Sequence, residues 1–280
     1  GKVGDMLQRI RELAVQSSNA TNSAADREAL QAEVAQLTAE IDRVAKTTSF
    51  NGKNLLDGSF SGAVFQVGSN AGDNISVGGI TNVKAEKLGT DTYSVTKELE
   101  IAKADYAKEA SFAKVDSPAD AATFKMKVGD TEINLGDLAA ASSVKERVGQ
   151  VVAAINAKTA DTGVTAFVEE QSDGNFKLIT KSDNLKVAED GTVTETEVTF
   201  TGLVGALQGK VTADNDTKIM ADAGTNLDIA AGQAKASKGL SELSVKTQSE
   251  AWDAIKQIDS AIDQVNSARA TLGAMQARFE

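Results

Sequence analysis

Apolar residues near the start of the chain recur every three or four positions, which is the spacing of one face of a helix. Between residues 2 and 17 the stripe consists of Val3, Met6, Ile10, Leu13 and Ser17. The alternation of three and four is that of a heptad seam, so we expect this face to pack against another helix. The small polar residues of SSNATNS, residues 17–23, favour turns and are expected to end the helix.

A second helix is predicted over residues 24–46, again from the spacing of its apolar positions. Its stripe consists of Leu30, Val34, Leu37, Ile41 and Val44. Ser23 or Asp26 could cap its first turn, because a short side-chain oxygen accepts hydrogen bonds from the free N–H groups there. At about 1.5 Å per residue, this helix would span on the order of 30 Å.

A third helix is predicted at the other end of the chain, over residues 247–280. Its stripe consists of Ile255, Ile258, Ile262, Val265, Leu272 and Phe279. Arg269 and Gln276 fall on the same stripe and weaken it towards the end. Isolated helices of this length are marginal in water, so helices from the two termini are expected to pack on each other. Since the chain begins and ends inside helices, we interpret it as a fragment of a longer helical rod.

The middle of the chain has a different pattern, in which short apolar stretches alternate with turn residues. Between residues 50 and 79, Asn51-Gly52 and Asp57-Gly58 are strong hairpin signals. Residues 123–136 predict another hairpin, which turns at Gly129-Asp130.

Further along, residues 163–182 predict two strands around Asp173-Gly174-Asn175, and residues 191–202 predict another strand. Residues 142–159 predict an amphipathic helix that Ser142 or Ser143 would cap. Residues 96–114 are ambiguous, and their alanines and lysines favour a helix.

These patterns together predict an α+β fold. A long antiparallel rod of heptad-packed helices from both termini would carry an inserted β-rich outer domain. We expect the helical core to be discontinuous, with residues 1–79 plus 223–280, and to include the hairpin region 50–79. The inserted domain would comprise residues 80–222.

Composition narrows the possible functions. The chain has no cysteine and no histidine, so disulfides, thiolate metal sites and imidazole general-base chemistry are impossible. A net charge of -11 argues against nucleic acid and against anionic membrane surfaces as partners. No apolar stretch approaches the length that spans a bilayer. Aromatic residues make up only 4% of the chain, so its core must be built from Ala, Val, Leu and Ile.

Carboxylates are the remaining candidates for a metal site or for catalysis. The acidic stretches SDGN, residues 172–175, and ADNDTK, residues 213–218, lack the spacing of a calcium-binding loop, and we interpret them as turns. The 40 acidic residues leave room for a glycosidase pair, but sugar sites normally offer aromatic platforms and Trp252 is the only tryptophan. We therefore expect no cofactor and no enzymatic activity.

Three stretches of the chain resemble bacterial flagellins. LQRIRELAVQSSNATNSAADREALQAEVAQLTAEIDRVAKTTSFNGKNLLDGSF, residues 7–60, resembles the conserved N-terminal region of that family. AIKQIDSAIDQVNSARATLGAMQARFE, residues 254–280, resembles the flagellin C-terminal helix. VVAAINAKTADTGVTAFVEEQSDGNFKLITKS, residues 151–182, resembles the flagellin hook IN motif of the variable outer part.

The resemblance implies a structural subunit of the extracellular flagellar filament, which assembles with copies of itself for motility. It also implies a core fragment, because the extreme termini of flagellins form a coiled coil that neither end of this chain resembles. A fragment without them is expected to be monomeric. Besides the chain itself, the implied partners are Toll-like receptor 5, a flagellar export chaperone and the filament cap protein.

By the same resemblance, Arg9, Leu13, Gln16 and Glu33 match positions where flagellin subunits touch and where the receptor binds. In the helical pattern Arg9, Gln16 and Glu33 flank the seam and Leu13 lies on it. The residues alone favour solvated flanks around a core leucine. The resemblance favours an interface role for Arg9, whose planar guanidinium suits a contact of this kind. Leu13 is expected to serve both the core and the interface.

Two other functions stay open at this point. A hook–filament junction protein would share the helical pattern, although LQRIRELAVQ favours a flagellin. A surface-binding flagellin homologue could take an acidic or neutral polysaccharide through the inserted domain. In that case the lysines that would offset the negative charge are Lys125, Lys127, Lys177 and Lys181.

Overall fold

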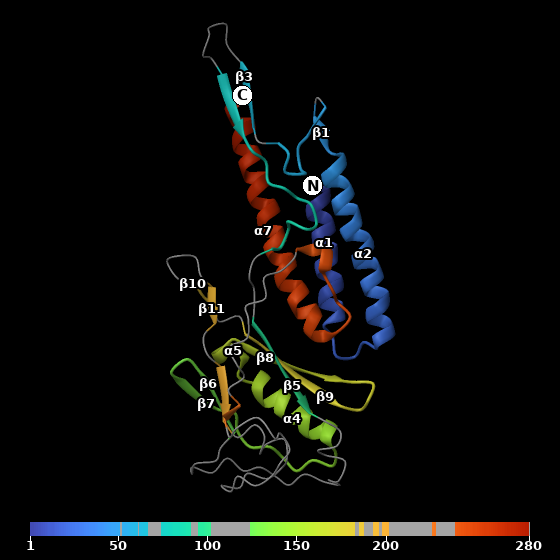
Figure 1. The fold of residues 1–280 in the computed structure, drawn as a ribbon, viewed down its shortest axis with the longest axis vertical. Coiled ribbons are helices and arrows are strands. Elements are labelled where there is room, and N and C mark those ends of the chain that lie inside the picture. The colour runs from blue at the N-terminus through green and yellow to red at the C-terminus, as the bar shows by residue number, and fades with distance from the viewer. Residues whose placement is uncertain are drawn as a thin grey trace. The chain divides into compact units, whose positions relative to one another are not determined.

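The computed structural model describes residues 1–50, 52–60, 62–66, 74–90, 95–101, 124–182, 185–187, 193–195, 198–201, 226–227 and 239–279. The chain divides into two compact units. Unit 1 comprises residues 1–93 and 236–280, and unit 2 comprises residues 94–235. Each unit has a hydrophobic core of its own. Figure 1 shows the helices and strands of both units.

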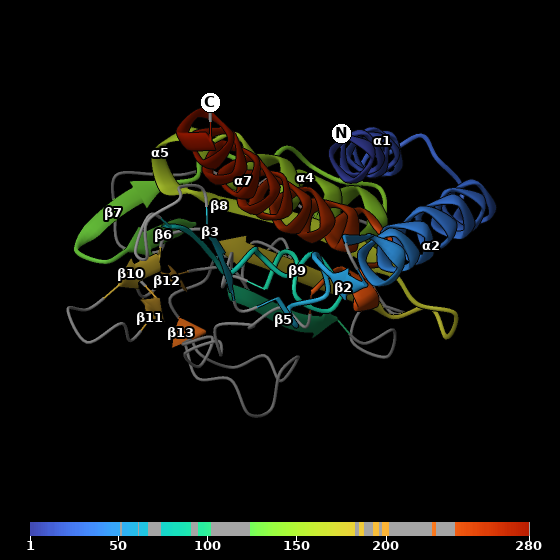
Figure 2. The same cartoon turned by 90° about the horizontal axis from the view of Figure 1, so that it is seen from above.

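Unit 1 is built on three helices, α1 (Lys2–Ser17), α2 (Ala24–Thr47) and α7 (Gln248–Phe279). Helix α1 packs against both α2 and α7, and it is antiparallel to each of them (Figures 1 and 2). The direction follows from the contacts: Arg11 reaches Asp259, whereas Gln248 donates to the Ser18 carbonyl. The three predicted helices are confirmed, and their packing on each other gives each a buried face.

The buried faces of these helices are rich in alanine. The buried apolar positions are Val3, Leu7, Ile10, Leu13 and Ala14 in α1, Val34, Ile41 and Ala45 in α2, and Ala251, Ala254, Ile258, Ala261 and Val265 in α7. The buried polar positions are Ser17 in α1 and Ser249, Asp253 and Gln257 in α7. Ile255 and Ile262, both on the predicted stripe of α7, are only partly buried. A single methyl side chain lets two helix backbones approach closely, which suits the alanines at these buried helix contacts.

The turn between α1 and α2 is fixed by hydrogen bonds from both sides. Ser23 Oγ accepts from Asp26 N at 3.2 Å, and the Asp26 carboxylate accepts from Ser23 N at 3.0 Å, which is a capping box. Both predicted residues therefore take part in the cap: the Ser23 side chain accepts one of the two hydrogen bonds, and the Asp26 side chain accepts the other. Arg27 donates to the carbonyl oxygens of Ser17 and Asn19, each at 3.0 Å, and so ties the start of α2 to the end of α1.

Two hairpins follow α2 in unit 1. Strand β1 (Ser49–Phe50) pairs with β2 (Lys53–Asn54), and β3 (Gly62–Gln66) pairs with β4 (Asn74–Gly78), both antiparallel. The hairpin predicted at Asn51-Gly52 is confirmed by the β1–β2 pair.

The hairpin predicted at Asp57-Gly58 is wrong, because β2 and β3 do not pair with each other. The Asp57 carboxylate instead accepts from Asn54 Nδ2 at 2.9 Å and from Ser59 N at 3.0 Å, and this closes a local bend.

The stretch after β4 belongs to the core of unit 1, although residues from 80 onwards were predicted to lie in the inserted domain. Val83, Ala85 and Leu88 are buried with the helices. The short 3-10 helix η1 (Leu240–Glu242) adds Leu240 to the same core. The division of the chain thus falls after residue 93 and before residue 236, rather than at 79 and 223. That unit 2 is a separable outer domain stays a prediction.

Unit 2 combines antiparallel strands with a covering helix. Its elements are β5 (Val95–Ile101), β6 (Lys125–Val128), β7 (Thr131–Asn134), α4 (Val144–Asn156), α5 (Thr159–Thr162), β8 (Val164–Glu170), β9 (Phe176–Ser182), β10 (Leu185–Val187), β11 (Val193–Glu195), β12 (Val198–Thr201) and β13 (Asn226–Leu227). The strand orders are β5-β9-β8, β13-β12-β6-β7 and β10-β11. Helix α4 packs against β8 (Figure 2).

Several predictions for unit 2 are confirmed. Strands β6 and β7 pair around Gly129-Asp130, and β8 and β9 pair around residues 173–175. Ser143 caps α4, with its Oγ accepting from Glu146 N at 3.2 Å.

Two predictions for unit 2 need correction. Residues 95–101 are not helical, because they form β5 and pair along β9, with Leu99 opposite Leu178. The rest of the ambiguous stretch, residues 102–114, lies outside the described residues. The single strand predicted over residues 191–202 is two short strands, β11 and β12, which pair with different partners.

The core of unit 2 contains aromatic side chains from both of its larger sheets. Phe124 precedes β6, Phe200 lies in β12 and Phe176 begins β9, and all three are buried with α4 residues such as Val151. In the described part of either unit, no helix has the length and apolar character needed to cross a membrane.

Candidate functional site

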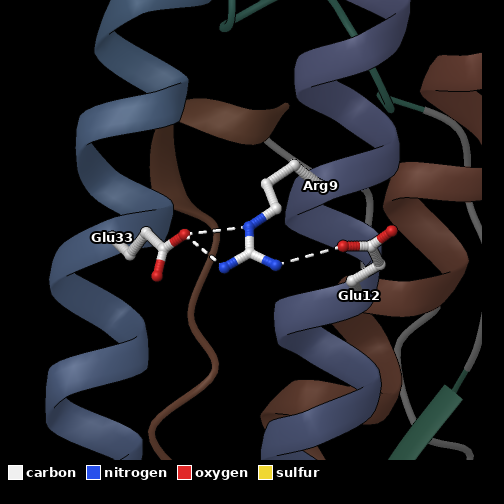
Figure 3. Close-up of polar contacts among 3 residues, drawn as sticks. All are labelled: Arg9, Glu12 and Glu33. Atoms are coloured by element: carbon white, nitrogen blue, oxygen red, sulfur yellow. Dashed lines mark hydrogen bonds and ion pairs between the residues drawn. The ribbon is translucent and has the colours of Figure 1, made fainter.

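Arg9 lies between two carboxylates on the surface of unit 1 (Figure 3). Its Nε and Nη2 both donate to Glu33 Oε1, at 2.9 Å and 2.8 Å, and its Nη1 donates to Glu12 Oε2 at 3.1 Å. The structure therefore brings together two of the four residues predicted for the interface, Arg9 and Glu33.

The helix pair positions this contact. Because α1 and α2 are antiparallel, residues on either side of the turn face each other in reverse order. The Ser23 cap sets where α2 begins, and Arg27 ties that first turn to Ser17. Glu33 is then about as far along α2 from the turn as Arg9 is along α1, so the two side chains meet.

The electrostatics of the site hold the guanidinium in one orientation. Arg9 and Glu33 are 48% and 42% exposed, so their ion pair contributes little to folding. The hydrogen bond to Glu33, followed by that to Glu12, raises the pKa of Arg9 above its already high usual value. Three of the five guanidinium N–H groups are used. Two guanidinium N–H groups take no part in these three bonds, and about half of the side chain is exposed.

Gln16 and Leu13 differ in what they can contribute. Gln16 is exposed on α1, and its backbone carbonyl oxygen accepts from Asn19 N at 3.2 Å. Leu13 is 1% exposed and packs in the core of unit 1. The expectation that Leu13 also serves the interface is therefore corrected: the side chain is enclosed by its own unit and offers no surface to a partner.

The structure adds polar contacts that sequence reasoning missed. Glu12 lies three residues after Arg9, and that helical spacing could have identified it. Arg11 Nε donates to Asp259 Oδ1 at 2.6 Å, and this hydrogen bond raises the pKa of Arg11. Nothing in the sequence links Arg11 to a residue of α7, because the pair exists only once α1 and α7 have packed.

The lysines proposed for polysaccharide binding do not act as one exposed group. Lys181 is 2% exposed in β9, and Lys125 forms an ion pair with Glu132 at 2.5 Å. Lys127 is exposed and Lys177 is partly buried. This reduces the basic surface on which the polysaccharide alternative depended.

The described residues contain no cluster of three or more acidic side chains that could hold a metal ion. In the acidic turn at residues 172–175, Asp173 accepts from the backbone and side-chain nitrogens of Asn175, at 2.9 Å and 3.0 Å. Its carboxylate thus closes the turn, as expected. The other acidic stretch, residues 213–218, lies outside the described residues.

Two family models match the chain. Residues 1–61 match the bacterial flagellin N-terminal helical region, and residues 123–184 match the flagellin hook IN motif. The first match covers α1, α2 and the β1–β2 hairpin, including Arg9 and Glu33. The second runs from β6 to the end of β9 and lies within unit 2.

Flagellins are similar to the chain in sequence along almost all of its length. Flagellin B of Vibrio cholerae is 32% identical over 282 residues, which is 98% of this chain and 61% of the relative. B-type flagellin of Pseudomonas aeruginosa is 52% identical over 86 residues, which is 31% of this chain and 17% of that protein. The chain therefore spans about three fifths of the length of the relatives that it matches throughout.

Among solved structures, FliC from Burkholderia pseudomallei is 25% identical, with 99% of this chain and 94% of that chain covered. The TM-score of that match is 0.48. The two family models and the similarity along nearly the whole sequence agree with each other, and together they support a bacterial flagellin.

Proposed function

We propose that this chain is part of a structural subunit of the bacterial flagellar filament and catalyses no reaction. The observation that carries the proposal is the match of residues 1–61 to the flagellin N-terminal helical region. Those residues form α1 and α2, which pack with α7 into one core. In a filament, function comes from surfaces that repeat between identical subunits along an open helical lattice.

In this proposal unit 1 belongs to a long, heptad-packed helical rod, and unit 2 is the variable outer domain. The antiparallel packing of α1 on both α2 and α7 supports the rod. The separate core of unit 2 supports its assignment as an inserted domain, since exposed domains tolerate change when they fold on their own. The assembled protein would be extracellular, and its other partners would be an export chaperone and the cap protein.

Complementation of a flagellin-deleted bacterium tests the filament proposal. The full-length gene is expressed in that strain, and the cells are examined by electron microscopy and in a swimming assay. Filaments decorated by an antibody raised against this chain, together with restored swimming, are expected. Secretion of soluble protein with bare hooks would contradict the proposal, and a short collar without a filament would favour the junction-protein alternative.

We further propose that Toll-like receptor 5 recognises unit 1 through Arg9, Gln16 and Glu33. Arg9 supports this because two carboxylates hold it half-exposed, and an oriented guanidinium loses little freedom on binding. Gln16 supports it because it is exposed on the same helix, two turns further on. Leu13 has no place in the proposal, since it is buried.

Receptor reporter cells test this second proposal with a matched pair of variants. Arg9→Ala should raise the concentration needed for half-maximal response by about tenfold or more, because interface arginines are frequent hot spots. Arg11→Ala is the control: Arg11 is two residues away, is 45% exposed and also forms one interhelical ion pair. Equal activity of Arg9→Ala and the parent would rule out the assignment of Arg9. Equal losses in both variants would indicate an effect on the helices rather than on the contact.

A further inference from the structure

The chain leaves the helical unit and returns to it at two glycines that lie in the same part of unit 1. Gly89 is next to the last described residue before unit 2, and Gly239 is the first described residue after it. We call Gly89, Gly239 and the backbone they contact the glycine crossing. The outgoing and returning segments are joined there by Leu240 N, which donates to Ala85 O at 2.7 Å and to Leu88 O at 3.1 Å.

Both glycines are required by their surroundings as well as by their backbone angles. Gly89 has a φ of 66°, and a Cβ at that position would lie 2.6 Å from the carbonyl oxygen of Gln257 in α7. Gly239 has φ 77° and ψ -175°, a region that only glycine visits readily. A Cβ there would lie 2.6 Å from both the carbonyl carbon and the oxygen of Glu86. In each case the obstacle is backbone, which cannot swing aside as a flexible side chain can.

The glycine crossing lies next to the core of unit 1. Leu88 and Leu240 are 0% and 1% exposed, and both pack with the three helices. The backbone of Gly89 is held a second time, by its N–H donating to Gln264 Oε1 of α7 at 3.2 Å. The backbone of residues 85–89 therefore lies close to the backbone of α7 and also close to the backbone of residues 239–240.

We propose that the glycine crossing is a lock that closes the helical unit at the point where the inserted unit joins it. A long inserted segment costs entropy when its ends are held together. In unit 1 those ends are held by hydrogen-bonded backbone next to the buried Leu88 and Leu240. The stability of the helical unit is thereby made independent of the segment between residues 91 and 238.

Glycine substitutions in the full chain test the lock, and the chain provides matched controls. Gly52 also has a positive φ, 76°, but a Cβ there would have nothing within 4 Å. Asparagine adopts positive φ more readily than other side chains. Gly52→Asn therefore controls for the backbone angle, whereas Gly89→Asn adds the clash with Gln257. Gly239→Ala combines both penalties, and Gly89→Asn keeps the test available if Gly239→Ala does not fold.

The first readout is the fluorescence of Trp252, the single tryptophan of the chain, which lies in α7 of unit 1. Gly239→Ala and Gly89→Asn are expected to lower its thermal midpoint by about 5–10 °C, and Gly52→Asn by about 2 °C or less. The second readout is hydrogen exchange resolved by peptide. Exchange should rise throughout α1 and α7 in both crossing variants, and it should stay unchanged in β8 and β9.

Three outcomes would overturn the lock. In one, the crossing variants match Gly52→Asn in midpoint and in exchange. In another, exchange rises only at residues 85–89 and 239–243 while the helices stay protected, which would make the crossing a local turn. In the third, β8 and β9 lose protection together with the helices, which would mean that the two units are not independent.

Discussion

The two units of this chain reach a buried core by different routes. The core of unit 1 is made by segments far apart in the sequence, since α1 packs against α7. Among the residues that the structure describes, this core contains no aromatic side chain. The core of unit 2 lies between paired strands and α4, and it contains Phe124, Phe176 and Phe200. Small side chains suit helices whose backbones approach closely, whereas large rings fill the wider space between a sheet and its cover.

Because of this difference, the fold of each unit requires different parts of the chain. Unit 1 depends on both ends of the chain and on the crossing that closes it, because α7 must come back to α1. Unit 2 combines local pairing, such as β6 with β7 and β8 with β9, with pairing between distant strands, such as β5 with β9. Changes in the segments that connect the units should therefore alter the stability of the two units by different amounts. Truncating one large core side chain should cost either unit a similar free energy of unfolding.

The largest expected effect comes from removing the inserted unit at different boundaries. Replacing residues 91–238 with a short Gly/Ser linker should leave a helix-rich protein that melts cooperatively, because Leu88 and Leu240 stay hydrogen-bonded at the crossing. Replacing residues 80–222, the boundary predicted from sequence, also deletes Val83, Ala85 and Leu88 from the core. Losing a buried leucine alone costs about 2–5 kcal/mol, and a domain has about 5–15 kcal/mol in total.

Circular dichroism melts of the two deletion variants decide this prediction. The variant that lacks residues 80–222 should melt at much lower temperature or without cooperativity. If it were as stable as the variant that lacks residues 91–238, the segment 80–90 would not be part of the helical unit. If both variants were unfolded, the two units would share one core.

A pair of core truncations tests whether the units melt independently. Phe200→Ala in unit 2 and Ile258→Ala in unit 1 remove side chains that are at most 1% exposed. The expected costs are about 3–5 kcal/mol for Phe200→Ala and about 2–5 kcal/mol for Ile258→Ala. Trp252 fluorescence should detect the loss in Ile258→Ala and miss it in Phe200→Ala. A lowered Trp252 midpoint in Phe200→Ala would show that the units are coupled.

Local features of both units could be predicted from the sequence. The spacing of Val3, Ile10 and Leu13 identified the face of α1, and the turn residues at Gly129-Asp130 identified a hairpin, because periodicity and turn chemistry act over a few neighbouring residues. Capping is equally local, which is why Ser23 was found without the structure. The candidate site came from the flagellin resemblance, and the helical pattern added only that Arg9 and Glu33 flank the seam.

Features that depend on distant partners could not be predicted. Residues 95–101 form a strand because β9 offers its edge to them, and nothing within the segment records that partner. Ala254 and Ala261 are fully buried because α7 approaches its neighbours closely, but alanine gives too weak a hydrophobic signal to mark a core. Leu13 was assigned partly to an interface because a stripe on a helix does not reveal how completely its own unit covers it.

A smaller effect is expected from the helix caps, which occur in matched form in both units. Ser23 caps α2 and Ser143 caps α4, each accepting a hydrogen bond from the third residue beyond it at 3.2 Å. Ser23→Ala and Ser143→Ala should each cost about 1 kcal/mol, and substitution by glycine only a few tenths. Peptide-resolved hydrogen exchange should place the first loss in unit 1 and the second in unit 2. A loss that appeared in both units after either change would contradict their independence.

The smallest expected effect is a pH dependence confined to unit 1, at the bend that replaced the predicted Asp57-Gly58 hairpin. Hydrogen bonds from the Ser59 side chain, the Ser59 backbone and the Asn54 amide lower the pKa of Asp57 to about 2. Because the folded pKa lies below the unfolded value of about 3.9, the ionised carboxylate stabilises the fold above pH 4, and this contribution is lost as the pH falls towards 2. The thermal midpoint followed by Trp252 fluorescence should therefore fall less between pH 4 and pH 2 in Asp57→Asn than in the parent.

Glu28→Gln, which removes one charge from an exposed position on α2, is the control. A parent and an Asp57→Asn variant that lose stability in parallel over this range would show that the bend carries no acid-sensitive stabilisation.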